Sequence, residues 1–183
     1  MHLDASQLLS PAQLLGYLAF VLGVSAFLQT NDRRLKVLLA SECVAYAAHF
    51  ALLGNPTAAS SAAVSFTRVL LSLRTRSRRL AVVVIAVYLG LGAVLVRSPA
   101  GWLPVVGSSI STWALFTMHG IRMRLLVLTS TLLWLANNLL SGSIGGTLLE
   151  GVIAVASIST IARMVRDARR DAPALQAGDP GAP

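Results

Sequence analysis

Long apolar runs alternate with short polar breaks along almost the whole chain. Seven of these runs reach the roughly 17 residues that a helix needs to cross a bilayer. Lipid offers no hydrogen-bond partner to a peptide backbone, so we expect each run to form a helix that satisfies its own backbone groups. The runs cover residues 11–28, 35–53, 57–73, 80–96, 102–118, 123–140 and 144–162.

The pattern of the first runs returns 88 positions later. Residues 41–54 align with residues 129–142 by class of side chain, although few letters are identical. The equivalent basic and glycine positions are Arg34 and Arg122, Lys36 and Arg124, and Gly54 and Gly142. A repeat inside an apolar chain indicates a duplicated membrane protein.

The repeat divides the chain into two three-helix units, residues 11–73 and 102–162, joined by a linker helix at 80–96. Three is an odd number, and the single linker span gives both units the same orientation, so we predict parallel repeats in a 3+1+3 arrangement. The fold class is therefore an all-α membrane protein with seven transmembrane helices. A short segment, 1–10, precedes the first unit, and a basic and then disordered tail, 163–183, follows the second. We expect the Val- and Leu-rich linker helix to face lipid, and tight turns at 54–56 and 141–143.

Composition agrees with this membrane assignment. Hydrophobic residues make up 55% of the chain, charged residues only 12%, and the mean hydropathy is +0.72. The net charge of +8 comes from Lys and Arg that follow the first, third, fifth and seventh runs, whereas the opposite ends carry only Arg97. This pattern places the N-terminus outside and the C-terminus in the cytoplasm. Membrane lipid is thus the expected partner of these charges, and nucleic acid is not. The first run has no Lys or Arg before it, so we interpret it as a retained helix and not as a cleaved signal peptide.

A few polar side chains recur in register within the second helix of each unit. Glu42, Tyr46 and His49 are spaced to share one helix face. Their equivalents in the second unit are Ser130, Trp134 and Asn137, with Asn138 beside them. Aromatic walls with a few directed polar groups are typical of a small-molecule site, so we predict that these residues, apart from Glu42, bind substrate. The alternative is structural, since such side chains also join transmembrane helices or sit at membrane interfaces.

Three charged side chains inside the runs are candidates for ion pairing or ion coupling. Glu42 and Arg68 lie at similar depth, and we predict that they pair. The alternative is that Arg68 extends to the inner surface. Glu150 is predicted to pair with His49, to take a proton, or to reach water.

Enzyme chemistry finds no support in the sequence. No spacing of His, Cys and acidic residues indicates a metal site, and no nucleophile–base pair is recognisable. The glycine-rich stretch 141–146 lacks the ending of a phosphate-binding loop. Cys43 is the single cysteine, which excludes an internal disulfide, and we interpret it as a packing residue. We therefore expect neither an enzyme nor a cofactor.

Four segments carry a resemblance to a known family. They are Leu-Gly-Tyr-Leu-Ala-Phe at 15–20, Gln-Thr-Asn-Asp-Arg-Arg at 29–34, His-Phe-Ala-Leu-Leu-Gly at 49–54 and Trp-Leu-Ala-Asn-Asn at 134–138. Through them the chain resembles the YgjV-type bacterial inner membrane protein family over residues 11–162. The resemblance implies a multi-pass protein of the bacterial inner membrane.

More distantly, the 3+1+3 plan resembles the SWEET sugar transporters and the PnuC vitamin-precursor transporters. Those proteins hold substrate between two three-helix bundles with aromatic and asparagine side chains, a role that Trp134, Asn137 and Asn138 would carry here. The sequence departs from the related PQ-loop proteins, because Leu28-Gln29 stands where a Pro-Gln pair is typical. The first unit also has Tyr46 and His49 in place of Trp and Asn, so a substrate does not carry over.

The sequence favours a small-solute transporter that binds an unknown small polar solute between the two units. No ATP-binding motif is present, so transport is expected to be facilitated or proton-coupled, with Glu42 or Glu150 as the proton carrier. The alternative is a membrane scaffold or partner subunit without transport, which predicts a dry, packed interior. Whether the chain forms a homo-oligomer is left open.

Overall fold

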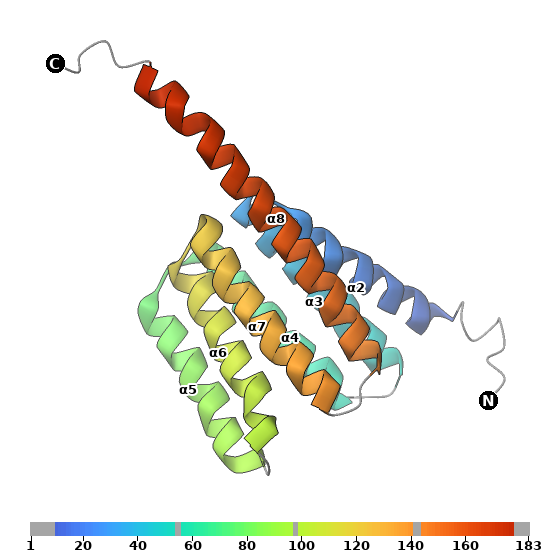
Figure 1. The fold of residues 1–183 in the computed structure, drawn as a ribbon. Helices are drawn as coiled ribbons and strands as arrows, with labels where there is room; N and C mark the ends of the chain where they lie inside the picture. The colour runs from blue at the N-terminus through green and yellow to red at the C-terminus, as the bar shows by residue number, and fades with distance from the viewer. Residues whose placement is uncertain (1–9, 54–55, 97–98, 141–143, 178–183) are drawn as a thin grey trace.

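A computed structural model of the protein describes residues 10–53, 56–96, 99–140 and 144–177, and these ranges are helical throughout apart from short connections (Figure 1). The predicted turns at 54–56 and 141–143, and Arg97, fall wholly or largely outside the described residues. The helices are α2 (Pro11–Leu28), α3 (Asp32–Leu52), α4 (Pro56–Arg74), α5 (Arg78–Leu95), α6 (Trp102–Thr117), α7 (Gly120–Leu140) and α8 (Ile144–Ala177), with a 3-10 turn η1 (Pro99–Gly101) before α6. Each predicted apolar run corresponds to one of these α-helices.

Polar side chains mark where several helices begin. The hydroxyl of Ser10 accepts a hydrogen bond from the Gln13 backbone N–H ahead of α2, and Ser77 does the same for Leu80 ahead of α5. At the start of α3, the Asn31 side chain accepts from the Arg34 backbone N–H at 3.0 Å. Such caps satisfy N–H groups that have no partner within the helix. Because of its cap, α3 begins at Asp32, ahead of the apolar run predicted to start at residue 35.

The helices pack in two sets of three with α5 at one side (Figure 1). In the first set α3 contacts both α2 and α4, and in the second set α7 contacts both α6 and α8. The sets meet where α2 packs along α8 and where α4 touches α6. The linker helix α5 packs against α6. Residues of both sets can therefore face a shared interior.

The buried core lies where the two sets meet. Its fully buried side chains include Leu35, Phe116, Met123 and Val69. Around it, large apolar side chains such as Val83, Val94 and Leu132 point outward, as expected for a surface that faces lipid. Within the part of the chain that the structure describes, four segments have the length and hydropathy of a membrane span, namely α2, α3, α7 and Thr147–Arg170 of α8. The seven-span prediction is thus confirmed for the helices and, by this criterion, for four of the spans.

One boundary differs from the prediction at the C-terminal end. The last helix was expected to end soon after residue 162 and to give way to a disordered tail, but α8 continues to Ala177 (Figure 1). Arg and Ala dominate residues 163–172, and both have high helix propensity.

Candidate functional site

A pocket of about 580 Å³ lies among the helices, and each of the seven α-helices contributes to its wall. Six of the nine predicted site residues line it: Glu42, Tyr46, Arg68, Ser130, Trp134 and Glu150. They come from α3, α4, α7 and α8, so both sets of three helices supply polar groups to one space. The volume is in the range of small-molecule sites.

The other three predicted residues lie away from the pocket lining. His49 turns toward α2, where its Nδ1 is 2.6 Å from the carbonyl oxygen of Ala12 and its ring packs against Gly16. Asn137 and Asn138 are half-buried on α7 but do not line the pocket. The predicted pairing of His49 with Glu150 is therefore not formed, because the imidazole contacts a backbone carbonyl of α2 instead.

The predicted ion pair between Glu42 and Arg68 is also absent from the described residues, although both side chains line the pocket. Arg68 turns to α6 instead. Its Nη1 donates to the hydroxyls of Ser111 at 3.2 Å and Thr112 at 3.1 Å, and to the Ser108 carbonyl at 3.4 Å. A cluster of oxygen acceptors on one neighbouring helix thus holds the guanidinium in place of a carboxylate.

Several lining residues were not singled out from the sequence. They are hydroxyl-bearing or aromatic side chains, together with the cysteine: Cys43, Phe50, Ser65, Tyr88, Ser108, Ser111 and Thr131. Tyr88 belongs to the linker helix, which was expected to face lipid only, yet its ring centre is 5.9 Å from the Arg68 guanidinium carbon. Cys43, interpreted from the sequence as a packing residue, also lines the pocket. The run Ser-Ser-Ile-Ser-Thr at 108–112, placed inside an apolar segment, is the sequence signal that could have identified this part of the lining.

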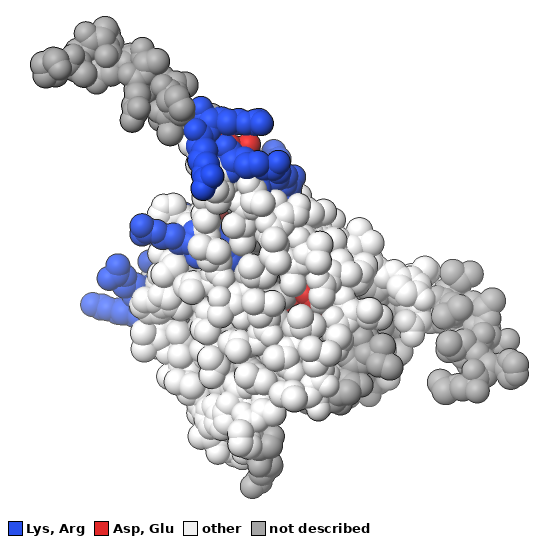
Figure 2. Space-filling model, in the orientation of Figure 1, with Lys and Arg blue, Asp and Glu red and all other residues white. Residues whose placement is uncertain are grey.

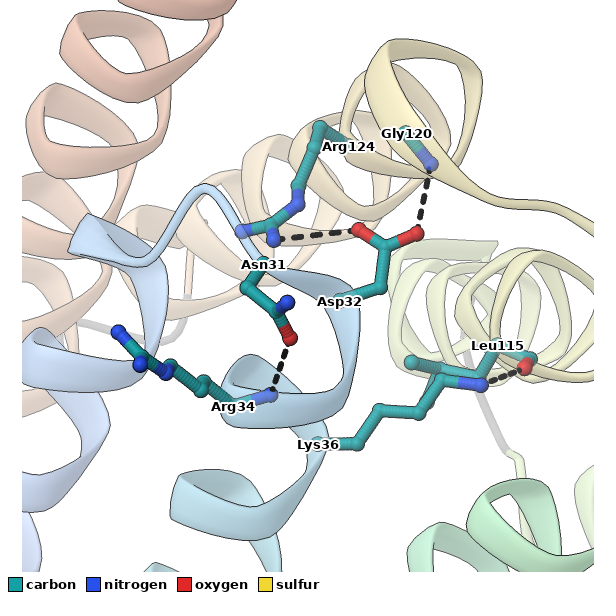
Figure 3. Close-up of polar contacts among 7 residues, drawn as sticks. All are labelled: Asn31, Asp32, Arg34, Lys36, Leu115, Gly120 and Arg124. Carbon is teal, nitrogen blue, oxygen red and sulfur yellow. Dashed lines mark hydrogen bonds and ion pairs between the residues drawn. The ribbon is translucent and has the colours of Figure 1, made fainter.

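Lys and Arg gather at one end of the molecule, around the C-terminal part of α8 and the neighbouring helix ends (Figure 2). Two basic residues at this end do not project into solvent. Lys36 on α3 is 6% exposed and Arg124 on α7 is 4% exposed. The repeat predicted from the sequence makes their positions equivalent, and each side chain contacts the other set of helices (Figure 3). The sequence places both among the basic residues that follow the first and fifth runs, and the structure puts them near the starts of α3 and α7, where they are buried.

Asp32 ties the first turn of α3 to the first turn of α7 (Figure 3). Its Oδ2 accepts a hydrogen bond from the Gly120 backbone N–H at 2.7 Å, and its Oδ1 is 3.3 Å from Nη2 of Arg124. Gly120 has a φ of +59°, a conformation that glycine adopts without strain. The N–H of a helix start favours a negative charge, so the carboxylate compensates both this helix end and Arg124.

Lys36 makes a second tie close by (Figure 3). Its Nζ donates to the carbonyl oxygen of Leu115 on α6, and to that of Ser72 on α4 at 3.1 Å. On the other side of the bundle, Arg163 of α8 donates to the carbonyl of Leu28 on α2 at 2.7 Å. Polar contacts at the basic end therefore join the two sets of helices through Asp32, Lys36 and Arg163, and Lys36 also joins α3 to α4 within the first set.

The pocket walls differ in chemistry along their length. At the floor, Phe27, Leu115 and Val127 belong to the buried core. Glu42 and Glu150 also line the pocket, and neither carboxylate accepts a hydrogen bond from another described residue. Charged groups at membrane depth are costly and are usually functional when they face an interior space.

Comparison with known proteins places the chain in a family. Residues 10–168 match the family Imp-YgjV, described as bacterial inner membrane protein. The chain is also 37% identical over 159 residues to the inner membrane protein YgjV of Escherichia coli (strain K12), which covers 87% of each chain. No solved structure matches, so the distant resemblance to SWEET and PnuC transporters stays a prediction. The chain belongs to the YgjV family of bacterial inner membrane proteins.

Proposed function

We propose that this inner membrane protein is a small-solute transporter that binds its substrate in the pocket between the two sets of three helices. The pocket itself is the observation that carries the proposal, because a structural scaffold has no need of about 580 Å³ of space lined by both sets. A wall that combines the aromatic rings of Tyr46 and Trp134 with serine and threonine hydroxyls suits a small polar solute.

The contacts between the sets support a rocking mechanism. The sets contact each other through α2 with α8 and through α4 with α6, the two pairs that a two-fold relation between parallel repeats would exchange. Lys36 and Arg124 are equivalent in the repeat, and each reaches across to the other set. Two units related in this way can tilt against each other around a fixed central site.

The closed basic end assigns a direction to this conformation. Basic ends of membrane proteins favour the cytoplasm, so the ties of Asp32, Lys36 and Arg163 would seal the cytoplasmic side. Core residues such as Phe27, Leu115 and Val127 also line the pocket. We therefore assign the described conformation to an outward-facing state, in which solute enters from the periplasm.

Counterflow into proteoliposomes tests transport. Purified protein would be reconstituted with unlabelled glucose, choline or nicotinamide inside, and uptake of the same labelled solute would be followed. At least one solute should enter faster than into empty liposomes. Trp134→Ala should lower that uptake roughly tenfold, the effect of losing about 1.4 kcal/mol of binding.

Leu148→Ala is the matched control, because Leu148 is an exposed apolar residue on α8 outside the pocket lining. It should leave uptake within about twofold of wild type, a difference below 0.5 kcal/mol. Uptake that is equal with and without protein for all three solutes would count against the transporter, as would equal losses in the pocket and control variants.

A further inference from the structure

The charged residues that line the pocket indicate which class of solute it would bind, which its volume alone does not. Three ionisable residues that are charged when exposed to water at neutral pH line it: Glu42 from α3, Glu150 from α8 and Arg68 from α4. The carboxylates outnumber the guanidinium, and none of the lysines or histidines that the structure describes lines the pocket. An anionic excess at membrane depth needs a compensating positive charge from somewhere.

Arg68 does not provide that charge by direct contact. Its Nη1 donates hydrogen bonds to Ser108, Ser111 and Thr112 of α6, and its guanidinium lies near the Tyr88 ring. No ion pair joins it to either glutamate in the described residues. The arginine therefore belongs structurally to the α4–α6 contact. Both glutamates line the pocket, the Glu42 carboxylate lies beside Gly23 of α2, and neither carboxylate receives a hydrogen bond from another described residue.

The aromatic wall complements these carboxylates. Tyr46 and Phe50 stack in parallel on α3 with their ring centres 5.7 Å apart, and Tyr46 lies one turn from Glu42. Trp134 contributes an indole from α7. Carboxylates beside aromatic faces are the combination that binds organic ammonium ions, through charge pairing and cation–π attraction.

We infer that the transported solute is a cation, an organic ammonium compound whose charged group sits between Glu42 and Glu150 and whose apolar part rests on the aromatic wall. This inference rests on the proposed transport function and names its substrate class. Neutral sugars would gain the hydroxyl contacts but leave the carboxylates uncompensated. Anions would meet repulsion from both glutamates.

Cys43 provides a native reporter for this selectivity. It is the single cysteine of the chain, it lines the pocket, and it directly follows Glu42. Two methanethiosulfonate reagents of similar size, one with a trimethylammonium group and one with a sulfonate, would be added to purified protein in detergent. Each rate of modification would be divided by that reagent's rate with 2-mercaptoethanol, which removes their intrinsic difference.

The cationic reagent should be favoured by roughly tenfold or more, as expected for unit charges a few ångströms apart in a medium of intermediate dielectric. In the Glu42→Gln/Glu150→Gln double variant the ratio should fall to about unity or below, since the field of both carboxylates is gone while the Arg68 guanidinium still lines the pocket. Any change in thiol reactivity affects both reagents alike and cancels from the ratio. Asp167→Asn, which removes an exposed carboxylate on α8 outside the pocket lining, should keep the wild-type ratio.

Choline should slow modification by the cationic reagent, whereas glucose at equal concentration should not. The single variants Glu42→Gln and Glu150→Gln give the same comparison if the double variant does not fold. Equal normalised rates for the two reagents in the wild type, or protection by glucose alone, would overturn the cation inference and leave transport standing. If neither reagent modifies Cys43 until the protein is unfolded, the pocket is closed to solutes and both proposals fail.

Discussion

The structure allows the effect of replacing Asp32, which binds Gly120 and Arg124, on stability to be predicted with a magnitude. Asp32→Asn keeps the shape of the side chain but removes its charge and one of its two acceptor oxygens. The native carboxylate accepts from both the Gly120 N–H and Arg124, and an asparagine can accept from only one of them in the same geometry. The variant should therefore destabilise the protein from its basic end.

The loss of one hydrogen bond to a charged group costs about 1.5–3 kcal/mol. Arg124 is only 4% exposed, and its Nε and Nη1 already lack partners in the described residues, so it would also lose its counter-charge. Breaking a buried ion pair costs about 3–5 kcal/mol, but Asp32 is 23% exposed, and water offsets part of this cost. The expected loss of unfolding free energy is about 2–4 kcal/mol, or a melting temperature lower by roughly 4–16 °C.

Thermal unfolding of the purified protein would measure this loss, with Asp167→Asn as the control for removal of an exposed carboxylate. The double variant Asp32→Asn/Arg124→Gln removes the uncompensated charge as well. It should recover part of the loss, with a coupling of about 1–3 kcal/mol between the two positions. A melting temperature unchanged in Asp32→Asn, or losses in the double variant that simply add, would refute the role assigned to this tie.

Two further variants test other contacts. In Gly16→Ala the new Cβ would lie 2.9 Å from Cε1 of the His49 ring, so the ring must move away from the Ala12 carbonyl. The free energy of unfolding should then fall by about 1–2 kcal/mol in a thermal melting assay. Gly90→Ala on α5 is the control, because its Cβ would meet no atom within 4 Å, and it should be neutral or stabilising in the same assay. A tolerated Gly16→Ala would show that this packing is not needed. Lys36→Met removes the hydrogen bond to the Leu115 carbonyl. In inverted vesicles it should raise the rate at which Cys43 is modified from the cytoplasmic side by roughly tenfold. An unchanged rate would argue that Lys36 does not stabilise a closed cytoplasmic end.

The sequence predicted the helices well because each apolar run has the length of a span and ends at polar residues. It also selected Glu42, Tyr46, Ser130 and Trp134, because period and repeat place them on one face of α3 and α7, and these faces do line the pocket. Helical spacing says which residues share a face, but not where that face ends. His49, at the edge of the same face, turns to α2.

The basic end was harder to predict for a physical reason. A lysine or arginine near the start of a helix usually extends to the membrane surface, and only the rotation of the packed helix decides whether it turns inward. That rotation depends on contacts between distant segments, such as the one from Asp32 to Gly120. The same is true of Tyr88, whose partner Arg68 lies on another helix.

The side from which Cys43 can be reached tests the central claim most directly. The trimethylammonium reagent, which does not cross membranes, would be applied to spheroplasts and to inverted vesicles, so that the same reagent meets the periplasmic and the cytoplasmic side in turn. A pocket sealed at its basic end predicts rapid modification in spheroplasts and slow modification in inverted vesicles. Equal rates from both sides, faster modification from the cytoplasm, or no modification from either side would contradict an outward-open pocket.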